Sequence, residues 1–122
     1  MLKVHNISFG NVALLCVEGR IIRGETDALR RAVLEQVGAS VVVLDLAQVN
    51  TIDAGGLGVM LELREYTESR GVEFRLENVT RLVRRILEIT RLDSVFKISR
   101  SDLPDVAIHR CIGMVSEMAS CA

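Results

Sequence analysis

The sequence predicts an α/β fold with a mostly parallel central β-sheet, an N-terminal hairpin and about four helices. Two apolar runs, residues 3–9 and 12–17, flank the pair Gly10-Asn11, and a Gly-Asn pair between such runs is typical of a hairpin. The run at residues 41–46, which begins with three β-branched valines and shows no alternation, indicates a central strand covered on both faces. Because parallel strands need crossover connections, the helical periodicity between the later strand-like runs favours a parallel sheet.

The first helix is expected between the hairpin and the central strand. Gly19 closes the second strand, and residues 21–25 are irregular. Thr26 or Asp27 can cap a helix, because its side-chain oxygen accepts hydrogen bonds from the orphan N–H groups of the first turn. Gly38 is a typical stop signal. The apolar face at the 3.6-residue period consists of Leu29, Ala32, Val33 and Val37.

Two more helices are expected after the central strand. One covers about residues 56–70 and ends at Gly71, and the strand that follows, residues 72–77, alternates with period two and is therefore half exposed. A helix at about residues 80–91 is strongly amphipathic. Its apolar side holds Leu82, Val83, Ile86 and Ile89, and its charged side holds Arg81, Arg84, Arg85, Glu88 and Arg91. An arginine surface fits an acidic partner or membrane phosphate, although solvated helix faces are usually charged as well.

The last predicted elements are a short strand at residues 95–98 and a C-terminal helix. Ser101 or Asp102 can cap this helix, with Pro104 in its first turn. Its apolar side would hold Ile108, Cys111, Ile112 and Val115. The length of the whole chain, residues 1–122, fits one domain.

Composition argues against several classes of function. The net charge is -1 and aromatic residues make up 3% of the chain, so we expect no nucleic-acid binding. No apolar run reaches the roughly 18 residues that cross a bilayer, and the polar-interrupted N-terminus is not a signal peptide. A cytoplasmic protein without direct membrane insertion is therefore expected. The three cysteines lack metal-type spacing, so we expect no metal. Their odd number in an intracellular chain predicts free thiols. No cofactor is expected. No catalytic group of Ser, Cys or His is evident, so we expect no enzyme activity.

The most informative stretch is residues 44–61, where a buried strand leads through Ile52-Asp53 and two glycines directly into a helix. Such a sequence predicts an exposed helix N-terminus at the carboxyl edge of a parallel sheet, where open α/β sheets usually place ligand or partner sites. The first N–H groups of the helix lack intrahelical partners. The Asp53 carboxylate can accept hydrogen bonds from one or two of them.

Several motifs in this order resemble the signature of the STAS domain family. The matching residues are Asp45-Leu46, Ile52-Asp53, Gly56-Leu57-Gly58, Gly19, Asn78-Val79-Thr80 and the stretch Leu92 to Ile98. The resemblance covers nearly all of residues 3–98. It implies the STAS fold over the single domain and a non-enzymatic switch module of signal transduction and transcription regulation in bacteria.

The loop at the helix start departs from one branch of that family. In the anti-sigma-factor antagonists (anti-anti-sigma factors) the loop reads Asp-Ser-Ser-Gly-Leu-Gly, and an anti-sigma-factor kinase phosphorylates the second serine. This sequence has Ala54 and Gly55 at the two serine positions, so the family's switch chemistry cannot occur there. The domain is then constitutively competent to bind, is switched at another place, or is a scaffold that has lost switching. Thr51 is the nearest substitute acceptor, although a Thr at a strand end more often satisfies a local backbone group.

The resemblance implies a partner-binding surface made of the helix start and the loop before the first helix. The candidate residues are Arg20, Arg23, Gly24, Asp53, Ala54, Gly55, Gly56, Leu57, Gly58 and Leu61. We interpret the glycines as allowing close approach of a partner's backbone, because the run lacks the Lys and Ser/Thr of a nucleotide loop. Leu57 and Leu61 either contact the partner or pack against a neighbouring helix.

The expected partner is an anti-sigma factor of the serine-kinase type. The domain would compete with sigma factor by occupying the kinase surface that otherwise sequesters it. Two other classes fit the missing serines: a STAS subunit of an ABC-type lipid transporter complex, and a scaffold in a signalling assembly. A homodimer is left open.

Overall fold

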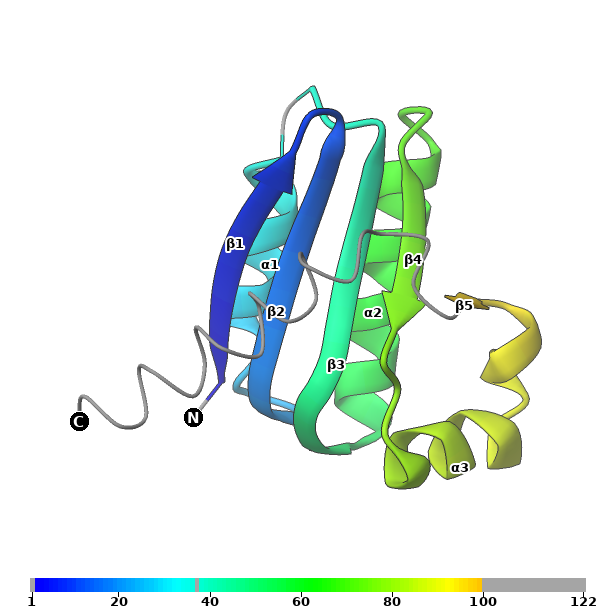
Figure 1. The fold of residues 1–122 in the computed structure, drawn as a ribbon. Helices are drawn as coiled ribbons and strands as arrows, with labels where there is room; N and C mark the ends of the chain where they lie inside the picture. Colours follow the sequence, from blue (N-terminus) through cyan, green and yellow to red (C-terminus); the bar gives the residue numbers. More distant parts are fainter. Residues whose placement is uncertain (1, 37, 100–122) are drawn as a thin grey trace.

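The computed structural model describes residues 2–36 and 38–99, which form five strands, three α-helices and one 3-10 turn. The predicted C-terminal helix lies outside these residues, so the expected count of about four helices is not reached within them. Figure 1 shows the elements. In chain order they are β1 (Lys3–Phe9), β2 (Val12–Ile21), α1 (Asp27–Leu34), β3 (Val41–Ile52), α2 (Ala54–Glu68), β4 (Glu73–Glu77), α3 (Arg81–Ile89), the 3-10 turn η1 (Leu92–Ser94) and β5 (Lys97–Ser99).

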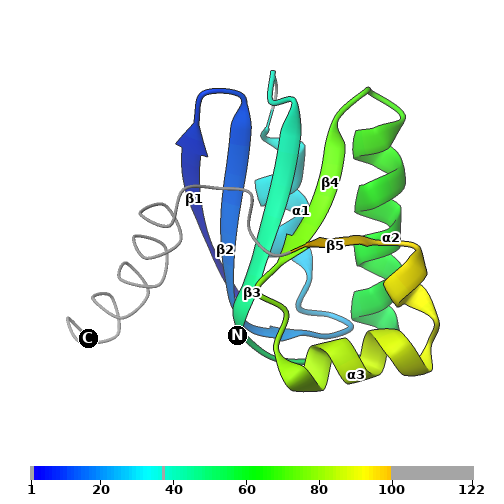
Figure 2. The same ribbon diagram turned by 45° about the vertical axis from the view of Figure 1, so that its right-hand side comes forward.

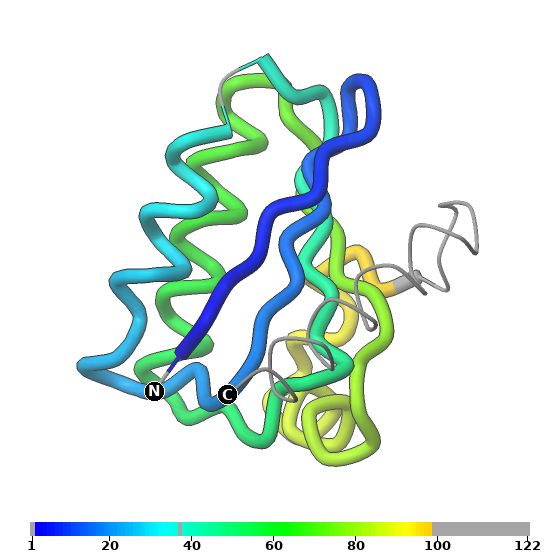
Figure 3. Tube along the Cα trace, turned by 60° about the vertical axis from the view of Figure 1, so that its left-hand side comes forward, coloured from blue at the N-terminus to red at the C-terminus, as the bar shows by residue number. Residues whose placement is uncertain are grey.

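The strands form one sheet in the order β1-β2-β3-β4-β5. β1 and β2 pair as the predicted antiparallel hairpin, and every later pair is parallel. Since consecutive parallel strands are joined by right-handed crossovers, α1 and α2 cover the same face of the sheet, where Figure 3 shows them side by side. Figure 2 shows α3 lying across the edge at which β3 and β4 end. The predicted α/β fold class is confirmed.

The central strands are buried on both faces, as their unbroken apolar sequences predict. On β2, Leu15 and Val17 join the main core beneath α1 and α2, whereas Leu14 and Cys16 point to the opposite face. Val43 of β3 joins that second cluster. Alternate residues therefore pack on opposite sides, which is the geometry of a strand with period two.

β3 is longer than the sequence indicates. The sequence predicts a strand that ends at Leu46, but β3 continues to Ile52. It does so because β2 also continues to Ile21, past irregularities of register on both sides of Gly19. Pairing with β2 therefore carries β3 to the start of α2.

The buried side of α3 differs from the predicted one. Val83 and Leu87 are fully buried, whereas Leu82 is 52% exposed and Ile89 is 71% exposed. The helix contacts the sheet edge through one narrow i, i+4 stripe, which leaves its flanks in solvent. The predicted arginine surface is exposed over α3, but Arg91 has a left-handed backbone (φ 60°) beyond the end of the helix.

The expectation of free thiols is wrong for Cys16, which is disulfide-bonded. The number of cysteines in a sequence says nothing about which side chains the fold brings together. Cys111 and Cys121 lie outside the described residues.

Candidate partner-binding site at the carboxyl edge of the sheet

Three connections meet at the carboxyl edge of the parallel strands, at the lower end of the molecule in Figure 1. They are the β2–α1 loop, the β3–α2 connection and the β4–α3 turn. Each parallel strand ends at this edge and each following helix begins there, so the arrangement follows from the topology. The predicted location of the site is a consequence of the sheet order.

Asp53 joins the first two of these connections. It is the N-cap of α2, and its Oδ1 accepts a hydrogen bond from the Gly56 N–H at 2.8 Å. Both carboxylate oxygens lie 3.1 Å from the Arg23 N–H, and the Asp53 N–H donates to the Ile21 carbonyl at 3.3 Å. One residue therefore satisfies an orphan donor of the helix and holds the β2–α1 loop against it.

These hydrogen bonds also fix the charge of Asp53. The Gly56 N–H contributes most, and the Arg23 N–H next, to lowering the pKa of this carboxyl below its ordinary value. A carboxylate that accepts backbone N–H bonds is favoured in its ionised form. Asp53 is exposed, so the site presents a fixed negative charge near neutral pH.

The first two glycines of α2 face the protein's own β2–α1 segment. A Cβ atom on Gly56 would lie 1.9 Å from the Ile21 carbonyl oxygen, and one on Gly55 would lie 2.6 Å from the Cβ of Arg23. A Cβ atom on Gly58 would meet nothing within 4 Å. Gly55 and Gly56 therefore do allow a close backbone approach, but the segment that approaches is the protein's own residues 21–23 and not a partner. Of the three, only Gly58 lies open to a partner.

The β2–α1 loop is a tight turn. The Glu25 N–H donates to the Ile22 carbonyl at 3.0 Å, and Gly24 has φ +85° at the third position, which a turn with positive φ there requires. Arg20 pairs with Glu25, with Nη2 and Oε2 3.4 Å apart. The exposed side chain of Arg23 comes from this turn, and that of Arg20 comes from the end of β2 just before it.

Asp45 holds the third connection, a role that sequence reasoning missed. Its Oδ1 accepts from the Ala47 N–H at 3.0 Å, and its Oδ2 accepts from the side-chain amide of Asn78 at 3.1 Å. Asn78 has a left-handed backbone (φ 53°) in the turn before α3, where Thr80 caps the helix. Burial raises the pKa of the Asp45 carboxyl, against the lowering effect of the two hydrogen bonds. The signal available in the sequence was a carboxylate near the end of the apolar run at residues 41–46.

The structure sorts the ten candidate residues and Thr51 by exposure. The exposed ones are Arg20, Arg23, Gly24, Asp53, Ala54 and Gly58. Thr51, Gly55 and Leu61 are half-buried, and Gly56 and Leu57 are buried. Leu57 is only 6% exposed and belongs to the main core, so the packing alternative applies to it. Leu61 packs against the same core at its edge. Thr51 pairs with Arg20 within the sheet.

Within residues 2–36 and 38–99, no group of three or more His, Cys, Asp or Glu side chains could hold a metal ion. Over the same stretch, no helix has the length and apolarity to span a bilayer.

Comparison with known proteins gives a family and several structural likenesses. The family model described as "STAS domain" matches residues 6–102. A STAS-domain containing protein of Pseudomonas aeruginosa is 35% identical over 57 residues, which are 47% of this chain and 56% of that protein. The matched region thus spans about half the length of this curated relative.

Two solved structures share the fold. An anti-sigma factor antagonist from Mycobacterium paratuberculosis has a TM-score of 0.72 at 21% identity, over 91% of this chain and 94% of its own. A sulfate transporter family protein from Wolinella succinogenes has a TM-score of 0.63 at 23% identity, over 90% and 92%. At these identities the likeness concerns the fold.

Proposed function

The chain belongs to the STAS domain family, and from this premise we propose that it is a non-enzymatic, regulatory protein-binding module of the anti-sigma-factor-antagonist type. Its docking surface is the α2 start together with the β2–α1 turn. The partner is an anti-sigma factor of the serine-kinase type, and the module works in the cytoplasm by occupying the surface that would otherwise hold sigma factor. The fold shared with the Mycobacterium antagonist supports the proposal.

The observation that carries the proposal is the junction at Asp53. Hydrogen bonds from Gly56 and Arg23 to one carboxylate hold the two connections in a single arrangement, so little conformational entropy is lost when a partner binds. Around this junction the exposed residues are small or charged. Ala54 and Gly58 leave room for a partner's backbone, and Arg20 and Arg23 supply positive charge beside them.

The absence of a hydroxyl at Ala54 and Gly55 supports a module that stays competent to bind. A phosphoserine would add a charge of about -1.5 to -2 at the rim of this surface. Here the β2–α1 turn occupies the space beside Gly55, since any Cβ there would contact Arg23. A serine at residue 55 would have to displace the turn, so the packing of this chain matches its lack of a phosphoacceptor.

The test is a binding experiment with a variant that blocks the surface without disturbing the fold. Gly58→Arg places a long side chain where a Cβ meets nothing within 4 Å, so the domain should fold as the wild type does. We expect its affinity for the anti-sigma factor in isothermal titration calorimetry to fall at least about tenfold. Glu65→Arg, on an exposed position of the same helix, is the control and should bind normally. Equal binding by both variants would reject this docking surface.

A second candidate is a STAS subunit of a membrane transporter complex of the ABC type, such as a lipid exporter. The fold shared with the sulfate transporter family protein favours it. Affinity purification from the native cell separates the two. Recovery of a kinase-like anti-sigma factor supports the first proposal, whereas recovery of a permease with its ATPase supports the second.

A further inference from the structure

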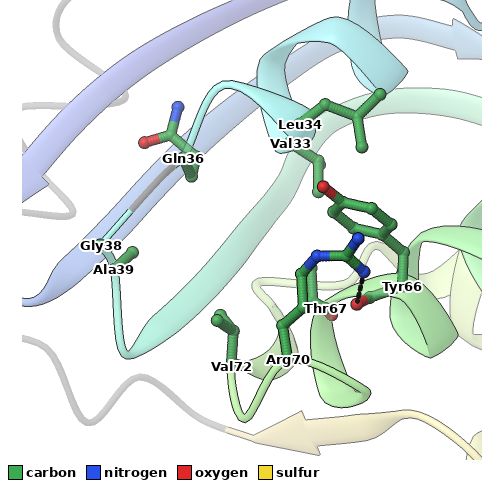
Figure 4. Close-up of a pocket in the computed structure, with 9 residues that line it drawn as sticks. All are labelled: Val33, Leu34, Gln36, Gly38, Ala39, Tyr66, Thr67, Arg70 and Val72. Carbon is green, nitrogen blue, oxygen red and sulfur yellow. Dashed lines mark hydrogen bonds between the residues drawn. The ribbon is translucent and has the colours of Figure 1, made fainter.

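A cavity of about 300 Å³ lies between the carboxyl-terminal ends of α1 and α2, at the end of the molecule opposite the docking surface. Figure 4 shows its lining. Val33 and Leu34 come from α1, Ala39 and Val72 from the segments that precede β3 and β4, and Tyr66 from α2. The volume is at the lower end of the range for ligand sites, and the walls are mainly apolar, as in such sites.

Arg70 places a positive charge at this cavity. Its guanidinium lies over the ring of Tyr66, 3.8 Å from the ring centre. Its Nη1 donates to the Tyr66 carbonyl at 3.3 Å and to Ser69 Oγ at 3.4 Å. These bonds cap the end of α2 and use one nitrogen of the guanidinium.

The other edge of the same guanidinium is not engaged. Within the described part of the chain, Arg70 has no carboxylate partner, and no acceptor lies at its Nε or Nη2. The Nε–Nη2 edge of an arginine matches a carboxylate in bidentate geometry. Stacking on Tyr66 holds the Arg70 side chain in one position. Less side-chain entropy is therefore lost when an anion binds to this edge.

The apolar surface continues beyond the first cavity. A second cavity of about 250 Å³ shares Leu34 and Tyr66 with it and extends to Leu63 and the Arg30–Glu62 ion pair. Leu34 is 44% exposed, and among the large apolar side chains of the described residues only Leu82 and Ile89 are more exposed. The two cavities together form a groove that follows α2 from Glu62 to the end of the helix at Glu68, about 9 Å at 1.5 Å per residue, and reaches Arg70 beyond it.

We propose that this groove binds a small amphipathic carboxylate, with its carboxylate on the free edge of Arg70 and its alkyl chain along Leu34, Tyr66 and the apolar walls. A flexible alkyl chain suits a shallow, elongated apolar groove. A single carboxylate matches Arg70, because the other cation that lines the groove, Arg30, is paired with Glu62. The site is separate from the docking surface, because α2 is about 22 Å long at 1.5 Å per residue and the two lie at its opposite ends.

The chain has one tyrosine and no tryptophan, so its intrinsic fluorescence reports on Tyr66 alone. Octanoate is the probe, and octanol and octylamine are the neutral and cationic analogues. We expect octanoate to change the tyrosine emission saturably and to shift the backbone amide signals of residues 66–72 in ¹⁵N NMR spectra. Octanol should bind about tenfold more weakly, which is the range of one charge-assisted hydrogen-bonded contact. Octylamine should not bind.

Two variants and a control complete the test. Arg70→Gln should bring octanoate down to the affinity of octanol, and Leu34→Glu should abolish binding, because it places a negative charge in the groove. Leu82→Glu, at a similarly exposed leucine on α3, should bind octanoate as the wild type does. Amide signals that do not move with octanoate at millimolar concentration would overturn the proposal. So would equal binding of octanoate and octylamine, or an unchanged octanoate affinity in Arg70→Gln.

Discussion

Replacing Gly56 by alanine tests the junction between α2 and β2 directly. The new Cβ would lie 1.9 Å from the Ile21 carbonyl oxygen, whereas real Cβ contacts essentially never fall below 3.0 Å. The two segments must therefore separate by about 1 Å. The Ile21 carbonyl also accepts the Asp53 N–H, and Asp53 in turn holds the Arg23 N–H, so the separation disturbs the whole junction.

The size of the effect can be worked out from its parts. Forcing extra volume into a tight contact costs about 1–3 kcal/mol, and weakening one or two backbone hydrogen bonds costs about 1 kcal/mol each. The better helix propensity of alanine returns about 0.5–1 kcal/mol. We therefore expect Gly56→Ala to lower the free energy of unfolding by about 2–4 kcal/mol, which corresponds to a drop in Tm of roughly 10 °C or more.

The assay is urea unfolding followed by circular dichroism at 222 nm, with Gly58→Ala as the matched control. A Cβ atom on Gly58 meets nothing within 4 Å, so the control should gain about 0.5–1 kcal/mol from helix propensity alone. The two alanine variants lie in the same helix and should change stability in opposite directions. Equal stabilities, or a Gly56→Ala protein as stable as the wild type, would refute the close packing of α2 on β2.

Three further variants test the other contacts at this edge of the sheet. Gly55→Ser should lose roughly 1–2 kcal/mol, as overpacking against Arg23 costs, and its amide NMR signals should shift at residues 22–24; signals that stay in place there would contradict the contact. Asp53→Ala should have a lower Tm at pH 7. Hydrogen bonds lower the folded-state pKa of Asp53, so its ionised carboxylate adds to the free energy of unfolding at neutral pH. This stabilisation is lost as pH falls below the ordinary pKa of 3.8. The Tm values of Asp53→Ala and wild type should therefore converge at acid pH, and a constant gap would oppose this account. Burial holds the pKa of Asp45 above 3.8, so its ionisation favours the unfolded chain and the wild type loses stability as pH rises through the folded-state pKa. As pH rises through that pKa, the Tm of Asp45→Asn should increase relative to that of the wild type. Parallel curves of Tm against pH for the two proteins would show that Asp45 does not titrate as expected.

Much of the fold could be predicted because its signals are local. The pair Gly10-Asn11 and the β-branched run of β3 are enough for a hairpin and a central strand. The length of β3 was missed because it depends on pairing with β2 beyond Gly19, where the register is irregular. No feature of residues 46–52 alone reveals that β2 reaches as far as Ile21.

The candidate site shows the same division. The position of the helix start and the capping role of Asp53 follow from strand order and residue type. The neighbours of Gly55 and Gly56 cannot be derived in this way, because they depend on where the end of β2 passes in space. The burial of Leu57 was also uncertain from periodicity, since α2 is apolar around much of its circumference. Sequence patterns therefore locate the start of α2, whereas the structure decides which residues around it are exposed.

The central proposal is a docking surface at the start of α2 that no kinase can switch off through residues 54 and 55. Its most direct test measures the affinity of the wild-type chain for the proposed partner, an anti-sigma factor of the serine-kinase type, before and after the chain is incubated with that kinase and ATP. We predict the same dissociation constant in both samples and no phosphate on residues 51–58 by mass spectrometry. A loss of affinity that accompanies phosphate on that segment would contradict the account.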